Sequence, residues 1–161
     1  MAYAEVKHID IDAIPVIDLS PLSDGAAGER FVGRQLRDTV QRIGFFYVKN
    51  HGVPQQKIDR AIETGAQFFH MDRAQKETVR VADYHRGFLP IGEATMSGAS
   101  KPDNKESFIW GWEVDPGDPD IESSNRILAP NRWPDILPEL REALDDYIRT
   151  INGLGISLLR A

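Results

Sequence analysis

The segment GFFYVKNHGVP (Gly44–Pro54) sets the organisation of the chain on either side of it. Its aromatic and β-branched run, Phe45–Val48, is typical of a buried strand, and the Asn-His-Gly sequence that follows is typical of a turn. Upstream, IPVIDLS (Ile14–Ser20) has the extended, apolar character of a second short strand. Between the two lies PLSDGAAG (Pro21–Gly28), whose composition predicts a turn.

Apolar residues that recur every three or four positions predict helices around these strands. One helix lies between the two strands and stops at Gly44. The next runs from Pro54 to about His70, because proline is tolerated in a first helical turn. Asp72 is a candidate cap for a further short helical turn that ends at Glu77.

The second half of the chain has fewer regular elements. Tyr84–Asn104 is rich in glycine and proline and should be largely loop, with YHRGFLP as an extended piece. Ser107–Trp112 has the character of a strand. An apolar stripe from Leu137 to Leu158 predicts a long helix, residues 136–161, that does not reach a stop signal before the last residue. The pattern as a whole predicts an α+β fold, and we expect the polypeptide to continue.

Composition excludes several classes of function. The chain has 161 residues, of which 41% are hydrophobic and 27% charged, as in ordinary soluble proteins. Its net charge of -6 argues against a nucleic-acid partner, because proteins of that kind gather Lys and Arg on one face. No apolar run approaches the roughly 20 residues of a membrane helix. Without cysteine there is no disulfide or thiolate site, and without a signal peptide we expect a cytoplasmic protein with no membrane partner.

Six blocks of the sequence are similar, in content and order, to the N-terminal region of the isopenicillin N synthase-like oxygenases, which are non-haem iron, 2-oxoglutarate-dependent enzymes. The blocks are IPVIDLS, GFFYVKNHGVP, AQFFHMDRAQKE, YHRGFLPIG, NKESFIWGWE and NRWPDILPELREAL. Each block alone is a plausible strand or helix, whereas the six in order are specific. Together they extend over most of the chain.

The resemblance implies an architecture in which these helices and few strands flank a double-stranded β-helix (jelly-roll) core. Residues 1–161 would form the N-terminal region, truncated before that core, and residues 136–161 the long connecting helix. The iron of the family is held by two histidines and one carboxylate. Those ligands belong to the core, so we expect no metal ligand and no catalytic residue in this chain.

The resemblance also implies a function for the parent protein: a dioxygenase (oxidoreductase) that uses Fe(II) and 2-oxoglutarate to oxidise a small organic substrate. We expect this chain to supply framework and part of the substrate pocket, to bind neither cofactor alone, and to be inactive alone. Its expected partners are the missing core, or a second copy through self-association. Two alternatives stay open: a non-catalytic truncated module that binds or regulates a partner, and an unrelated helical interaction domain.

Arg86 is the main candidate for substrate binding, because the resemblance places YHRGFLP near the mouth of the active site. A guanidinium there can bind a substrate carboxylate through two parallel hydrogen bonds. The alternative is an ion pair with one of the chain's 25 acidic residues. Tyr84, Phe88 and Phe108 are candidates for lining the same pocket, and ordinary core packing is the alternative for each of them.

The histidines and tryptophans are assigned structural roles. His8 and Asp10 have the H-x-D spacing of a metal motif, but they precede the first strand, and we expect no metal there. His51 should hydrogen-bond its own turn, and His70 should cap its helix. The tryptophans, which we expect to pack against the missing core, are Trp110, Trp112 and Trp133.

Overall fold

The computed structural model describes residues 14–82, 85–94, 101–115, 117–119 and 128–161. The chain forms two compact units. Unit 1 contains the described residues up to Pro54 together with Thr150–Ala161, and unit 2 is Gln55–Arg149. Helix α5 (Pro138–Arg160) contributes residues to both. Helices and short strands occur in each unit, so the mixed fold predicted from the sequence is confirmed.

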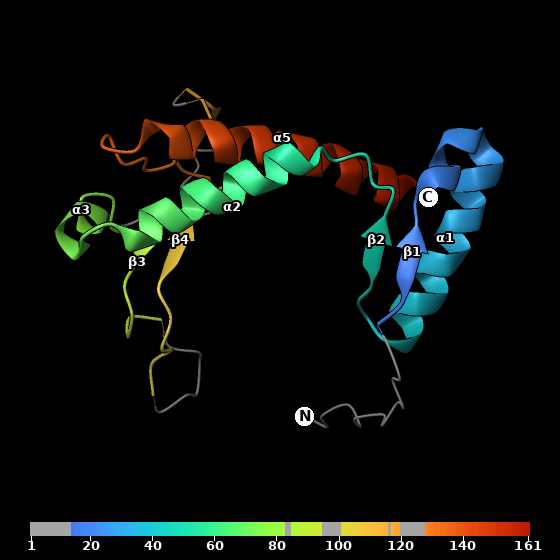
Figure 1. Ribbon diagram of the computed structural model, residues 1–161, viewed down its shortest axis with the longest axis horizontal. Helices are drawn as coiled ribbons and strands as arrows, with labels where there is room; N and C mark the ends of the chain where they lie inside the picture. Colours follow the sequence, from blue (N-terminus) through green and yellow to red (C-terminus); the bar gives the residue numbers. More distant parts are fainter. Residues whose placement is uncertain (1–13, 83–84, 95–100, 116, 120–127) are drawn as a thin grey trace. The chain divides into compact units, whose positions relative to one another are not determined.

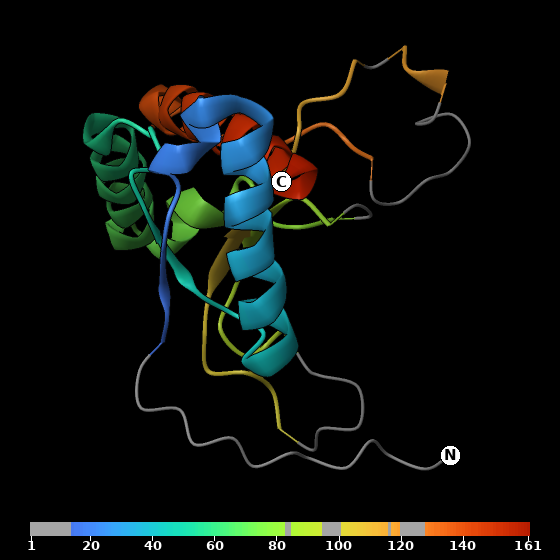
Figure 2. The ribbon, with the colours of Figure 1, turned by 90° about the vertical axis from the view of Figure 1, so that its right-hand side faces the viewer.

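Unit 1 is built on two parallel strands. β1 (Val16–Asp18) pairs with β2 (Tyr47–Lys49), with Val16 opposite Tyr47. Parallel strands require a crossover connection, and here it consists of the 3-10 helix η1 (Ser20–Asp24) and helix α1 (Gly25–Arg42). Figures 1 and 2 both show α1 beside the two strands.

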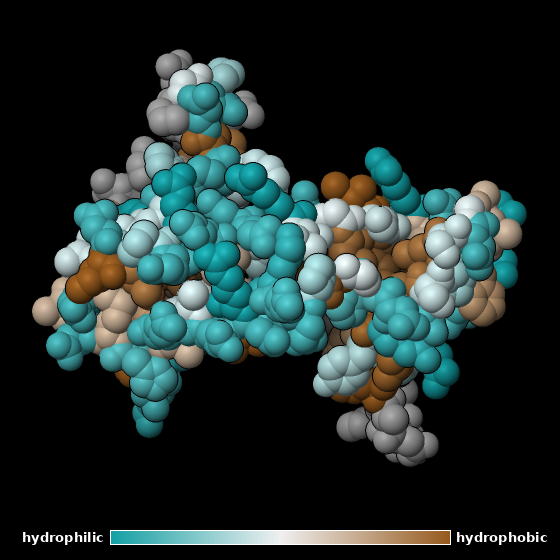
Figure 3. Space-filling model, turned by 45° about the horizontal axis from the view of Figure 1, so that its top comes forward, coloured by the Kyte–Doolittle hydropathy of each residue, from teal (hydrophilic) through white to brown (hydrophobic). Residues whose placement is uncertain are grey.

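One face of this sheet is buried and the other is exposed. Ile17, Leu19 and Val32 form the buried centre of unit 1, and the end of α5 packs against it. On the opposite face Val16 is 58% exposed and Tyr47 61% exposed. The prediction that Phe45–Val48 forms a buried strand was therefore wrong, because a two-stranded sheet with one helical layer covers only one of its faces. Figure 3 shows apolar residues that reach the surface in several places.

The predicted turn at Pro21–Gly28 is also wrong, since this segment is helical. Its two glycines have other roles. Gly25 has a φ of +65° at the junction of η1 and α1. A β-carbon on Gly28 would lie only 1.7 Å from the Pro21 carbonyl oxygen, so glycine at this position permits the close approach of the two helices.

Unit 2 combines helices with an antiparallel pair of strands. Helix α2 (Gln55–His70) is followed by α3 (Arg73–Glu77), and β3 (Gly87–Leu89) pairs with β4 (Ser107–Ile109). These elements confirm the predicted helices and the two extended segments, although β4 ends at Ile109 and not at the predicted Trp112. Asp72 stands at the N-terminus of α3 in a capping box, in which its own N–H donates to the Gln75 side chain at 3.1 Å.

Helices α2 and α5 run side by side in unit 2 (Figure 1). Two ion pairs join them. Lys57 contacts Asp146 at 2.7 Å, and Arg60 contacts Glu142 at 2.8 Å. The first pair is half-buried and the second is exposed, so we expect them to orient the helices more than to stabilise them.

The core of unit 2 is aromatic. Phe68 and Phe88 are at most 1% exposed, and their rings meet edge to face at 5.9 Å. Trp110 and Trp133 pack against this cluster, whereas Trp112 is 55% exposed. The expectation that all three tryptophans pack against the missing core was therefore wrong for Trp110 and Trp133.

The apolar stripe of α5 is covered by the chain itself. Leu140 and Leu144 are buried in the core of unit 2, and Leu154 and Leu158 pack against the core of unit 1. Among the described residues no helix is both long and apolar enough to cross a membrane.

Candidate functional site

Two of the four predicted substrate-binding residues lie on the β3–β4 hairpin. Phe88 lies opposite Phe108 in the strand register. Phe88 is buried in the core, and Phe108 is half-buried, with its ring 4.7 Å from that of Phe68. Tyr84 lies outside the described residues. Substrate binding by these residues and by Arg86 stays a prediction, and the positions of the two phenylalanines suit core packing.

Arg86 is half-buried directly before β3, and its guanidinium lies against the backbone of Gly111. Its Nη1 donates a hydrogen bond to the His85 carbonyl oxygen at 3.0 Å. A β-carbon on Gly111 would stand 2.8 Å from Nη2, so there is no room for a side chain while the guanidinium stays in place. The sequence pattern did not connect YHRGFLP with SFIWGW in this way.

Asn131 fixes the segment on which the guanidinium rests. The Gly111 N–H donates to Oδ1 of Asn131 at 2.9 Å, and Nδ2 of Asn131 donates to the Gly111 carbonyl oxygen at 2.8 Å. Nδ2 also donates to Glu113, whose carboxylate accepts a hydrogen bond from the Trp133 indole at 3.4 Å. A small hollow of about 70 Å³ is lined by residues that include Trp112, Glu113 and Asp145.

A largely buried ion pair joins Lys76 of α3 to Glu106, the residue directly before β4. Lys76 is 7% exposed, and its Nζ donates to both carboxylate oxygens of Glu106, at 2.9 and 3.1 Å. The third contact is the Phe69 carbonyl oxygen at 3.0 Å, and Nζ lies 5.3 Å from the centre of the Phe88 ring. The sequence does not reveal this pair, since nothing in a five-residue helix signals that one lysine is buried.

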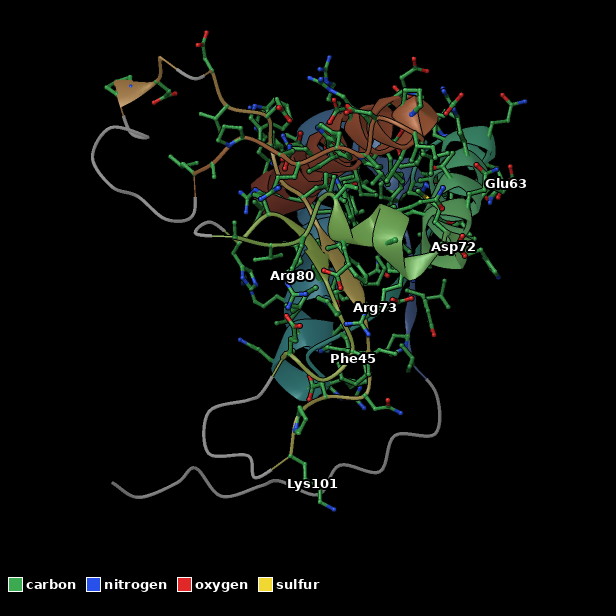
Figure 4. The ribbon with its side chains drawn as sticks, turned by 90° about the vertical axis from the view of Figure 1, so that its left-hand side faces the viewer. Phe45, Glu63, Asp72, Arg73, Arg80 and Lys101 are labelled. Atoms are coloured by element: carbon green, nitrogen blue, oxygen red, sulfur yellow. The ribbon has the colours of Figure 1, made fainter. Side chains whose placement is uncertain are left out.

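A second network of charges lies next to this pair. Glu77 accepts hydrogen bonds from Arg80 at 2.7 Å and from Arg73 at 3.2 Å, and Arg80 also contacts Glu93. The Arg80 hydrogen bond holds the pKa of Glu77 below its usual value, and the same bond raises the pKa of Arg80. Figure 4 marks Arg73 on α3 and Arg80 just after it. A hollow of about 130 Å³ has in its lining Arg73, Lys76, Phe88 and Glu106.

In unit 1 the turn after β2 is held by side chains. His51 Nδ1 accepts the Val53 N–H at 3.1 Å, which confirms its structural role. Asn50, with a φ of +56°, donates to Asp18 at 2.8 Å, and this bond together with the Ser20 N–H keeps the pKa of Asp18 well below its usual value. A hollow of about 290 Å³ lies beside this turn.

The described residues offer no iron site. Among them, no group of three or more His, Asp or Glu side chains lies close enough together to hold a metal ion. His70 sits at the end of α2 with Nδ1 2.7 Å from the Ala66 carbonyl oxygen, in agreement with its predicted capping role. His8 and Asp10 lie outside the described residues. A two-histidine, one-carboxylate centre therefore does not fit the residues described.

Comparison with known proteins shows the family to which this chain belongs. Residues 14–136 match the family model described as non-haem dioxygenase in morphine synthesis N-terminal. A 2-oxoglutarate-dependent dioxygenase of Dothideomycetidae sp. (strain 11243) is 30% identical over 149 residues, which cover 92% of this chain and 40% of that protein.

Two solved structures have the same fold. A 2OG-Fe(II) oxygenase family protein from Caulobacter crescentus superposes with a TM-score of 0.75 at 26% identity, covering 91% of this chain and 46% of that one. A full-length Neurospora crassa protein in complex with alpha-KG gives a TM-score of 0.70 at 24% identity, covering 90% of this chain and 44% of that one. The chain thus spans less than half the length of each of these three relatives. The match over residues 14–136 shows that this chain belongs to the non-haem, 2-oxoglutarate-dependent oxygenase family, in which it corresponds to the N-terminal region.

Proposed function

We propose that this chain is the N-terminal part of an oxygenase that uses Fe(II) and 2-oxoglutarate to oxidise a small organic substrate. In that protein it supplies framework and part of the substrate pocket. The family match over residues 14–136 carries the proposal. The iron and 2-oxoglutarate would be held by residues beyond those described, since no metal-binding group occurs among the latter.

The bare face of the sheet in unit 1 supports a role as framework. Parallel strands are normally covered on both faces, yet Val16, Tyr47 and Phe45 are each more than half exposed. These residues, with Ile14, form what we call the bare sheet face. Because the chain spans less than half of its relatives, the remainder of an oxygenase of that length is the natural cover for this face.

The role of unit 2 in this proposal is to place the β3–β4 hairpin. Its aromatic core and the buried pair of Lys76 with Glu106 anchor both strands. Arg86 lies at the start of this hairpin, where we place the mouth of the pocket. A carboxylate-bearing substrate would be bound there by charge-assisted hydrogen bonds.

A hybrid protein tests the proposal. In the hybrid, this chain replaces the segment that it matches in the Caulobacter crescentus relative and is followed by the rest of that relative. We expect the hybrid to convert 2-oxoglutarate to succinate in an iron-dependent reaction, and the 161-residue chain alone to do neither this nor bind iron one-to-one. A folded hybrid without iron-dependent turnover, beside an active parent relative, would contradict the proposal and favour a non-catalytic module.

A further inference from the structure

The contact between Arg86 and Gly111 is the most specific arrangement near the proposed pocket. A β-carbon on Gly111 would stand 2.8 Å from Nη2, 3.2 Å from Cζ and 3.4 Å from Nε of Arg86. Gly111 is not among the described glycines with a positive φ. Its backbone therefore accepts any residue, and the reason for glycine at this position is the space that the guanidinium occupies.

Asn131 holds Gly111 in place across 20 residues of sequence. Its side-chain amide accepts from the N–H of Gly111 and donates to the carbonyl of Gly111, as a neighbouring strand would. The other hydrogen of that amide is directed to Glu113. The amide is thus fixed at both ends, which makes the backbone beneath the guanidinium rigid.

We infer that Gly111 and Asn131 are positioning residues that hold the Arg86 guanidinium ready for a carboxylate on the substrate. This inference rests on the proposed function, in which Arg86 lies at the mouth of the pocket. A guanidinium presents its N–H groups in a planar fork that matches a carboxylate. When the plane is held in advance, less side-chain freedom is lost on binding, and the affinity rises accordingly.

The test uses the whole chain, with acetate as the probe and acetamide as a neutral control of the same size. Binding is followed by the NMR signal of the backbone N–H of residue 111 at constant ionic strength. We expect acetate to shift this signal saturably and acetamide to leave it unchanged. Arg86→Ala should weaken acetate binding at least about tenfold, the usual effect of losing a charged hydrogen bond.

Two variants test the positioning role. Gly111→Ala should push the guanidinium aside, because the atoms that a methyl group would meet are the far end of a flexible side chain. Asn131→Ala should release Gly111. We expect each to weaken acetate binding about three- to tenfold while the melting temperature stays within a few degrees of the wild type. The matched controls on α5 are Gly153→Ala, where a β-carbon meets nothing within 4 Å, and Asn152→Ala, which is exposed.

Each outcome decides the inference. Acetate affinity in Gly111→Ala and Asn131→Ala equal to that of the wild type would overturn it, and so would a wild-type chain that does not distinguish acetate from acetamide. If Asn131→Ala does not fold, Asn131→Asp replaces it, since aspartate still accepts from the Gly111 N–H but no longer donates to its carbonyl. Acetate binding requires no iron, so an inactive hybrid with intact acetate binding would count against the proposed function alone.

Discussion

The two units bury their apolar residues to different extents. In unit 2 the central aromatic side chains, Phe68 and Phe88, are covered by residues of the same unit. In unit 1 the sheet has Ile17 on a buried face and its neighbour Val16 on an exposed one. An antiparallel hairpin with helices on it can close locally, whereas a parallel pair normally needs a layer on both faces. The comparison shows that the aromatic core of unit 2 is closed by residues of its own unit. In unit 1 one face of the sheet is left open, which supports the proposal that this face receives a further layer.

Breaking the buried ion pair of unit 2 should have the largest effect. Lys76→Met leaves the Glu106 carboxylate partly buried without its cation, and we expect a loss of about 3–5 kcal/mol in the free energy of unfolding. Urea unfolding followed by tryptophan fluorescence measures this. The double variant Lys76→Met/Glu106→Leu should recover most of the loss. The control is Lys105→Met, at a largely exposed lysine, and a similar loss there would contradict the assignment.

Adjacent residues of β1 test the two faces of the unit 1 sheet directly. Ile17→Ala removes buried apolar volume and should cost about 2–4 kcal/mol, whereas Val16→Ala should cost about 0.5 kcal/mol or less. Thermal unfolding of both variants at the same protein concentration gives the comparison. Equal costs would mean that the face bearing Val16 is already covered in solution, for example by a second copy of the chain.

Glycines in two helices provide a smaller test. Gly28→Ala in α1 forces the backbone apart at Pro21, and we expect a cost of about 1–3 kcal/mol from overpacking. Gly65→Ala in α2 meets nothing within 4 Å and should stabilise its helix by up to about 1 kcal/mol. Circular dichroism melts of the two variants should therefore move in opposite directions. A harmless Gly28→Ala would show that η1 and α1 are not in close contact.

The smallest expected effect is a dependence on pH in unit 1. The pKa of Asp18 lies below its ordinary value of 3.8 in the folded chain, chiefly because Asn50 donates to its carboxylate. The unfolded chain then binds more protons in acid, so the stabilisation is complete above the ordinary value and is lost as the pH falls toward the lowered pKa. Asp18→Asn should be less stable than the wild type at pH 7 and equal to it in strong acid. Asp38→Asn, on the exposed side of α1, is the control.

Much of the fold could be predicted from periodicity and capping. The helices α2, α3 and α5 and the extended character of β3 and β4 followed from spacing, from Asp72 and from β-branched and aromatic runs. The exposure of Tyr47 could not, because an apolar run of three or four residues does not show how many layers cover a strand. The turn prediction at Pro21–Gly28 failed for a related reason, since glycine signals close approach as well as a turn.

The candidate site was predictable only in part. Arg86 was found from its place in YHRGFLP, and the residues that hold it were not. Asn131 and Gly111 are 20 residues apart in the sequence, and nothing in the sequence shows that they lie within hydrogen-bonding distance. The partner of Glu106 was likewise missed, because burial of Lys76 depends on tertiary packing against Phe88.

Hydrogen exchange of backbone amides tests the central claim most directly. The measurement compares the chain alone with the hybrid that contains the rest of the Caulobacter crescentus relative. We expect the amides of β1 and β2 to exchange much more slowly in the hybrid, because the bare sheet face becomes covered, while those of β3 in unit 2 change little. Unchanged exchange in β1 and β2, in a hybrid that is folded, would contradict the claim that this face receives the rest of the oxygenase.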